Sequence, residues 1–149
     1  MEIDKNLLAP CGLYCGVCGI RIAYNENNEK FKERLSGVYN LPVDQIRCKG
    51  CLSDDVFDYC KVCPIKSCNA ERGYDGCHQC GEFPCDFIHN FPMPVGKKVI
   101  LRAVPFRREH GTGKWVEDEE HRYVCPHCGN RIFRGAKRCN QCREPVDLD

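Results

Sequence analysis

The sequence of 149 residues lacks the apolar runs that carry a chain to or through a membrane. Residues 1–6 are charged or polar for the most part and only three apolar residues follow them, so the start does not have the form of a signal peptide. No later stretch approaches the ~20 apolar residues of a membrane-spanning helix. The net charge of +1 indicates no strong attraction to nucleic acids or membranes. We therefore expect a cytoplasmic protein that does not bind membranes.

Motifs of several enzyme classes are missing as well. The sequence has no glycine-rich loop suited to a phosphate, and no His-x-Glu followed by Pro-Cys-x-x-Cys as in zinc deaminases. Cys11, Cys15 and Cys18 have the ligand spacing of radical S-adenosylmethionine enzymes, but the alternating strands and helices of those enzymes are not recognisable. His110 and His121 lie near acids on helices expected to be exposed. We expect an accessory rather than a catalytic protein.

Cysteine, in contrast, is abundant, with 15 in the chain. Thiols stay reduced in the cytosol, where clustered Cys-x-x-Cys pairs are typical of metal sites, and an odd number excludes complete pairing into disulfides. Large aliphatic residues are sparse, so burial alone would give marginal stability. A structural zinc ion contributes roughly 10 kcal/mol or more of folding free energy in zinc-finger peptides. Zinc is therefore the expected metal.

Eleven cysteines lie in the first 90 residues: Cys11, Cys15, Cys18, Cys48, Cys51, Cys60, Cys63, Cys68, Cys77, Cys80 and Cys85. The spacing of the triplet from residue 60 to 68 is identical to that from 77 to 85, which suggests two related ligand clusters. Three thiols do not complete a tetrahedral zinc site. Three complete sites would need a twelfth ligand, for which His78, His89 and Asp86 are the nearest candidates. Two sites would leave three thiols free.

The stretch from Ala9 to Gly19 holds three of these thiols, Cys11, Cys15 and Cys18, without an obvious fourth. They could hold an iron–sulfur cluster with a ligand from elsewhere, although the ferredoxin run of four cysteines is absent. An incomplete site could also bind a substrate or an exogenous metal at its open position. The alternative to structural zinc is thus an iron–sulfur or metal-handling protein with its working centre here.

Near the C-terminus, Cys125 and Cys128 form one knuckle and Cys139 and Cys142 form a second. This is the spacing of a compact zinc ribbon with a hairpin over residues 130–138, and four thiolates complete a tetrahedral site without an open position. Rubredoxin-like iron is the competing metal. The ribbon is basic, through Arg131, Arg134, Lys137, Arg138 and Arg143. A solvated basic surface that contacts a protein partner is favoured over nucleic-acid binding.

The remaining pattern predicts a small, irregular, metal-stabilised α+β protein. Helices are expected at residues 17–24, 29–39, 86–90 and 115–123, with a turn at 41–46. Residues 97–104 are helical or extended, and Pro105 either ends that element or opens a helix that reaches His110. Thr112 is the expected N-cap of the last helix.

The proline- and glycine-containing stretch at residues 91–96 marks a domain boundary. The expected division is a cysteine-rich metal-binding domain of short helices and knuckle loops at 1–92, a helical connector at 93–122 and the zinc ribbon at 123–149. Trp115, the only tryptophan, is the expected docking anchor between the two metal modules.

Residues 8–90 resemble a cysteine-rich family known as domain of unknown function 3795. The matching motifs are Cys11–Cys18, Cys48–Asp54, Cys60–Cys68 and Cys77–Cys85. Gly19 departs from the family pattern, which often has proline there, and the tail resembles the version of the family with an appended zinc ribbon. The resemblance implies metal binding, zinc above all, and no activity. Together with the knuckles it leads us to expect three or four zinc ions per chain, with an iron–sulfur cluster as the alternative in the first domain.

Overall fold

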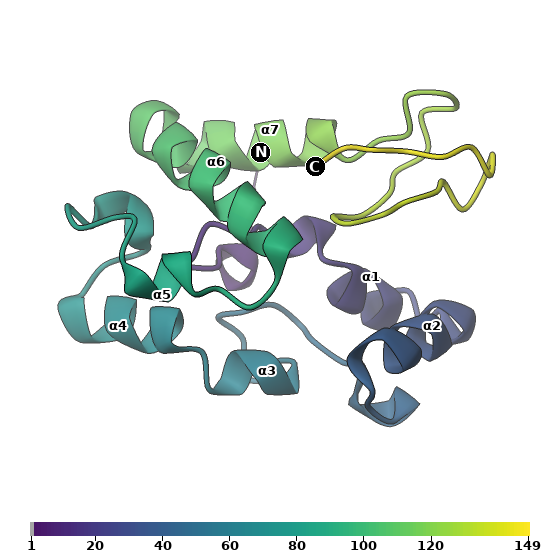
Figure 1. The fold of residues 1–149 in the computed structure, drawn as a ribbon, viewed down its shortest axis with the longest axis horizontal. Coiled ribbons are helices and arrows are strands. Elements are labelled where there is room, and N and C mark those ends of the chain that lie inside the picture. Colours follow the sequence, from purple (N-terminus) through teal and green to yellow (C-terminus); the bar gives the residue numbers. More distant parts are fainter. Residues whose placement is uncertain (1) are drawn as a thin grey trace.

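The computed structural model describes residues 2–149, and over this range the protein is mostly helical (Figure 1). The α-helices are α1 (Gly19–Asn25), α2 (Glu29–Tyr39), α3 (Asp58–Lys61), α4 (Pro64–Arg72), α5 (Asp86–His89), α6 (Pro94–His110) and α7 (Thr112–Arg122). Short 3-10 turns are η1 (Lys5–Leu7), η2 (Cys15–Val17), η3 (Val43–Gln45) and η4 (Cys77–Gln79). No helix within residues 2–149 has both the length and the apolar character needed to cross a membrane.

Extended pairing in the described residues is limited to isolated bridges, so the α+β expectation is not supported. The bridges join Leu8 to Tyr14, Val124 to Arg131 and Arg138 to Pro145. The predicted hairpin over residues 130–138 does not form, because its two ends pair outward with segments beyond the knuckles. The N–H of Arg134, at the middle of this loop, donates to the carbonyl of Val17, 2.9 Å away. The centre of this loop is thus docked on the N-terminal part of the chain.

The helices predicted at 17–24, 29–39 and 86–90 are confirmed as α1, α2 and α5, with shifts of one or two residues. Local chemistry explains α2 well. The side chain of Asn28 accepts a hydrogen bond from the N–H of Phe31 at 3.1 Å and so caps its first turn. At the other end Asn40 takes the left-handed conformation with φ 55°, which ends the helix.

Helix α6 resolves the stretch that the sequence left open, because it runs without interruption from Pro94 to His110 through Pro105. An internal proline has no N–H, so the carbonyl of Leu101, four residues earlier, loses its helical hydrogen bond. Pro105 and Leu101 are both exposed, so water can satisfy that carbonyl. The expected break at Pro105 is therefore absent. Helix α7 begins three residues earlier than predicted and Gly111, not Thr112, is its N-cap. The Thr112 hydroxyl instead accepts a hydrogen bond from Arg107 Nε at 3.1 Å.

Helices α3 and α4 were not predicted, although α4 has a clear signature. Pro64 occupies its first turn and Gly73 ends it in the left-handed conformation with φ +70°. The helix therefore has defined limits at both ends. These limits set the direction of Cys68, which lies in its middle.

The main core joins the start of the chain to α6 and α7. Its buried residues are Leu7, Ala9, Tyr14, Cys15, Val17, Val99, Ala103, Trp115, Val116 and Tyr123. Trp115 is fully buried, and its ring lies edge-on to that of Tyr14 with centroids 5.9 Å apart. In Figure 1 the purple N-terminal loop lies between α6 and the lower helices. Trp115 thus packs on the first cysteine stretch, while the three-part domain division stays a prediction.

Candidate metal centre

The ribbon segment, which we define as residues 123–149, brings its four cysteines together. The sulfur atoms of Cys125, Cys128, Cys139 and Cys142 all lie within 4.8 Å of one another. Cys125 and Cys142 are separated by 3.6 Å between sulfurs, and Cys128 and Cys139 by 3.7 Å. Among residues 2–149 this is the one group of three or more metal-ligating side chains with such spacing. The group could hold a metal ion.

Backbone groups of the two knuckles face these sulfurs. The N–H of His127 donates to Cys125 Sγ and that of Gln141 to Cys139 Sγ, both at 3.4 Å. Backbone N–H groups of Cys142 and Gln141 lower the pKa of Cys139 to about 6, because they stabilise the thiolate. Thiolate is the form that binds metal. The donor set and its surroundings therefore fit a closed tetrathiolate site.

The cysteine-rich segment, which we define as residues 7–90, distributes its eleven thiols between two neighbourhoods. The first, here called the seven-thiol group, comprises Cys11, Cys15, Cys18, Cys48, Cys51, Cys60 and Cys63. The N–H of Cys51 donates to Cys15 Sγ at 3.4 Å, and this hydrogen bond joins the Ala9–Gly19 stretch to the Cys48–Cys51 knuckle. Burial, together with neighbouring thiolates, raises the pKa of Cys51 to about 11 and that of Cys60 to about 12. Metal binding there must displace protons.

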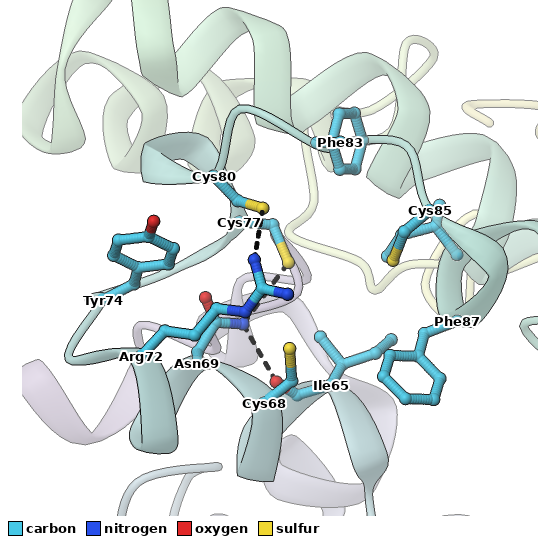
Figure 2. A pocket seen from close by; sticks show the side chains of 11 residues that line it. Ile65, Cys68, Asn69, Arg72, Tyr74, Cys77, Cys80, Phe83, Cys85 and Phe87 are labelled. Carbon is cyan, nitrogen blue, oxygen red and sulfur yellow. Dashed lines mark hydrogen bonds between the residues drawn. The ribbon is translucent and has the colours of Figure 1, made fainter.

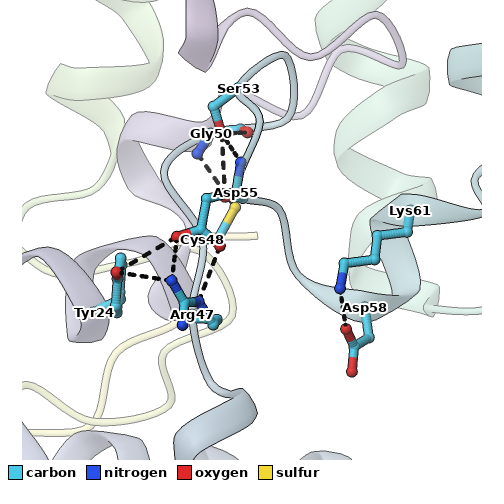
Figure 3. Close-up of polar contacts among 8 residues, drawn as sticks. All are labelled: Tyr24, Arg47, Cys48, Gly50, Ser53, Asp55, Asp58 and Lys61. Carbon is cyan, nitrogen blue, oxygen red and sulfur yellow. Dashed lines mark hydrogen bonds and ion pairs between the residues drawn. The ribbon is translucent and has the colours of Figure 1, made fainter.

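A polar network holds the Cys48–Cys51 knuckle in place (Figure 3). Arg47 donates to both carboxylate oxygens of Asp55, at 2.9 and 2.6 Å. The N–H of Lys49 donates to the carbonyl of Asp55 at 2.7 Å, and the Ser53 hydroxyl donates to the carbonyl of Gly50 at the same distance. The Arg47 guanidinium holds the pKa of Asp55 below its usual value. The loop is therefore fixed by its own side chains before any ion binds.

The second neighbourhood comprises Cys68, Cys77, Cys80 and Cys85, which line one small cavity (Figure 2). Its other lining residues are Ile65, Asn69, Arg72, Tyr74, Phe83, Phe87 and Ile88. The expected pair of equivalent triplets is therefore divided differently, since Cys68 lies with Cys77 to Cys85. The reason is α4: Cys63 precedes the helix in extended conformation, whereas Cys68 lies within it, on the face that also carries Ile65, Asn69 and Arg72.

Sequence reasoning missed three residues beside these thiols. Asn69 donates to Cys77 Sγ at 3.4 Å, and Arg72 donates to Cys80 Sγ at 3.7 Å. The Pro64–Gly73 frame of α4 could have placed both on the face that carries Cys68.

The third missed residue is Arg134, which was expected to lie on a solvated basic surface. Its guanidinium donates to the carbonyl of Tyr14 at 3.0 Å and lies beside thiols of the seven-thiol group. Burial alone would lower its pKa, but the thiolates of Cys18 and Cys15 raise it. The ribbon segment thus supplies a cation to the other group of thiols, which no local pattern could indicate.

The three candidates for a twelfth ligand do not line the Cys68 cavity. His89 and Asp86 are exposed. His78 is partly buried, and desolvation together with Arg107 lowers the pKa of its imidazole to about 4, so it is neutral. The role of a twelfth ligand stays a prediction for all three.

These features define a small, mostly helical, cysteine-rich protein with a four-cysteine group that could hold a metal. The family described as "Protein of unknown function (DUF3795)" matches residues 7–90, more than half of the chain, and the protein belongs to this family. The match covers all eleven cysteines of the cysteine-rich segment and does not include the ribbon segment. Comparisons with curated proteins and with solved structures give no match.

Proposed function

We propose that this is a cytoplasmic zinc-binding accessory protein whose metal ions are structural. The observation that carries the proposal is the convergence of Cys125, Cys128, Cys139 and Cys142, with all sulfurs within 4.8 Å. Four thiolates suit zinc and leave no position open for a substrate. Two or three further ions in the cysteine-rich segment would bring the total to three or four.

The position of the Arg47–Asp55 polar network beside a knuckle loop supports the accessory role. The ions would hold loops that join short helices, and the network of Arg47 and Asp55 supports a knuckle loop rather than a reacting group. Exposed apolar side chains, among them Val38, Tyr59 and Val62, suit contact with a protein partner. We therefore propose an adaptor that presents a metal-stabilised surface to another protein.

The alternative function is an iron–sulfur or metal-handling protein. The seven-thiol group favours it, because seven thiols do not divide into two complete four-ligand sites and Cys11, Cys15 and Cys18 belong to this group. In that case the ribbon would still hold structural zinc, and the working centre would lie in the cysteine-rich segment.

Metal and sulfide analysis of anaerobically purified protein separates these two functions. Structural zinc predicts a colourless protein with three or four zinc ions per chain, no acid-labile sulfide, and unfolding on addition of a strong chelator. A brown protein with stoichiometric iron and acid-labile sulfide would replace the zinc proposal for the cysteine-rich segment. Absence of any metal from the ribbon cysteines would overturn the proposed function as a whole.

A further inference from the structure

The cavity between α4, η4 and the start of α5 is small and surrounded by thiols. Its volume is about 20 Å³, enough for one ion or one water molecule. Cys68 comes from α4, Cys77 and Cys80 from the η4 turn, and Cys85 from the residue that precedes α5. Figure 2 shows Cys68, Cys77 and Cys80 near the guanidinium of Arg72, with Cys85 further to the right. Three separate segments therefore direct soft ligands into one ion-sized space.

We propose that Cys68, Cys77, Cys80 and Cys85 form a second tetrathiolate site that binds one zinc-like divalent ion. The site rests on the same thiolate chemistry as the proposed function and adds a specific ligand set to it. Helix geometry makes Cys68 part of this set: Ile65, Cys68, Asn69 and Arg72 recur at helical spacing and all line the cavity. These four sulfurs are not as close together as those of the ribbon segment, so an ion would draw them together around the cavity that they line.

Buried hydrogen-bond donors distinguish this site from ordinary packing of cysteine in a core. Asn69 is only 3% exposed, and its amide donates to Cys77 Sγ at 3.4 Å as well as to the Ile65 carbonyl at 2.9 Å. A thiol packed as a small apolar group needs no such donor. Metal-bound thiolates do need donors, which orient them and balance their charge.

Arg72 places a positive charge beside this site, where four thiolates around a divalent ion would carry two excess negative charges. Its guanidinium contacts Cys80 Sγ at 3.7 Å and is itself held by Glu82 at 2.7 Å. The pair therefore holds a cation beside Cys80, one of the four proposed ligands. Glu82 lies between Cys80 and Cys85 in the chain, so the loop that joins these two cysteines also carries the carboxylate that holds Arg72.

Cadmium substitution of the full-length protein tests the ligand set directly. Cadmium–proton correlation NMR should show one cadmium ion coupled to the β-protons of Cys68, Cys77, Cys80 and Cys85, and a different ion coupled to the ribbon cysteines. Coupling of Cys68 to the same ion as Cys60 or Cys63 would overturn the inference and restore the triplets read from the sequence. A missing ribbon signal would instead overturn the proposed function, so the two failures are distinguishable.

Paired variants give a second measurement that does not depend on assignment. Cys68→Ser and Cys80→Ser should each lose the same cadmium resonance, whereas Cys63→Ser, five residues before Cys68, should lose another. Arg72→Gln should keep the resonance and weaken metal retention against a chelator by about tenfold. Retention unchanged in Arg72→Gln, or Cys68→Ser and Cys63→Ser losing one common resonance, would count against the site.

A separate observation concerns a larger cleft between the α1–α2 pair and the ribbon segment. Its volume is about 170 Å³, and its polar lining includes Arg21, Arg34, Arg131 and Arg138 with a single carboxylate, Glu26. Within the described part of the chain, Arg21 and Arg34 have no carboxylate within 4.0 Å. Arg131 lies 3.9 Å from Glu120, so the excess positive charge of the hollow comes mainly from the other three guanidinium groups.

We infer that this cleft binds the phosphate group of a small phosphorylated ligand. Guanidinium groups offer paired N–H donors that match phosphate oxygens, and they are the residues most suited to such recognition. Asn25 and Asn140 add amide groups to the same lining. The cleft spans the family-matching segment and the ribbon segment, so an occupant would contact both.

Titration of the metal-loaded protein with inorganic phosphate and with a mononucleotide, followed by calorimetry, tests this cleft. Both ligands should bind, and the double variant Arg21→Ala with Arg34→Ala should bind at least about tenfold more weakly. Lys30→Ala, an exposed charge loss on α2 outside the cleft, should bind like the unmodified protein. Equal weakening in Lys30→Ala would indicate general charge attraction and refute the site. Binding of a single-stranded RNA but of neither small ligand would refute it too.

Discussion

The two cysteine-bearing regions hold their thiols in different ways. In the ribbon segment all four come from two knuckles, and the sulfurs lie within 4.8 Å of one another. Its small core joins two of these cysteines to three apolar residues, with Cys125, Cys139, Ile132, Ala136 and Val146 buried together. In the cysteine-rich segment the thiols are spread over short helical elements and the loops between them, and the surrounding core includes α6 and α7.

This difference indicates how each region depends on metal. The ribbon segment has few apolar residues beyond its ligands, so the ion is its core and its removal removes the fold. The cysteine-rich segment packs against Trp115 and the buried face of α6, so part of its structure has an apolar source of stability. Four changes test this comparison, and we order them from the largest expected effect to the smallest.

Cys125→Ser should have the largest effect, and its main effect should fall on the ribbon segment. Because Arg134 lies in that segment, metal retention in the cysteine-rich segment should weaken only as far as it does in Arg134→Gln. Loss of a ligand removes a metal contribution of about 10 kcal/mol, so residues 123–149 should unfold and one metal ion per chain should be lost. Hydrogen exchange should become fast there and stay slow in residues 7–122. His127→Ser is the matched control, because it keeps the backbone N–H that faces Cys125. Metal loss from both regions would refute the comparison.

Trp115→Ala should act on the other region. Trp115 is fully buried beside Tyr14, and truncation of such a side chain costs about 3–5 kcal/mol. Denaturant unfolding of the metal-loaded protein should show this loss, while the ribbon keeps its metal. Trp115→Phe should cost clearly less, because it retains most of the apolar contact. A variant that releases ribbon metal as readily as its other ions would show that the regions are not independent.

Arg134→Gln tests a charged group that reaches from the ribbon segment to the seven-thiol group. Removal of the guanidinium should weaken metal binding in the cysteine-rich segment by about tenfold, as expected for a group outside the ligand shell. Competition with a chelator measures this, and ribbon affinity should not change. Lys137→Gln removes an exposed charge from the same loop and should have no effect. Equal weakening in both variants would assign the effect to net charge.

Asp55→Asn should have the smallest effect, because the Arg47 pair is partly exposed. The pKa of Asp55 is lowered in the folded state, so its contribution is present above the unfolded pKa of about 3.9 and is lost as the pH falls through the folded value. The variant should therefore be slightly less stable than the unmodified protein at neutral pH and equally stable in acid. A gap in melting temperature that persists at pH values well below about 3.9 would contradict this linkage.

Prediction from sequence succeeded where the signal was local. Asn28 and the apolar face of residues 29–39 specify α2, and two knuckles bring four thiols together in the ribbon segment. Prediction failed where the result depended on which face of a helix is exposed or on contacts between segments distant in the chain. Pro105 looked like a break because the exposure of its helix face was unknown, and the hairpin at 130–138 was wrong because the N–H of Arg134 pairs with Val17 instead.

The sequence by itself determined that the protein is cysteine-rich and built around knuckle pairs, since spacing of two residues brings two sulfurs together without help from the rest of the chain. It also determined the family, through residues 7–90. Only the tertiary structure decided that Cys68 faces Cys77 to Cys85 and that Arg134 reaches the seven-thiol group. The position of Cys68 depends on which face of α4 it occupies, and the position of Arg134 depends on the packing of segments distant in the chain. Neither is encoded in local spacing.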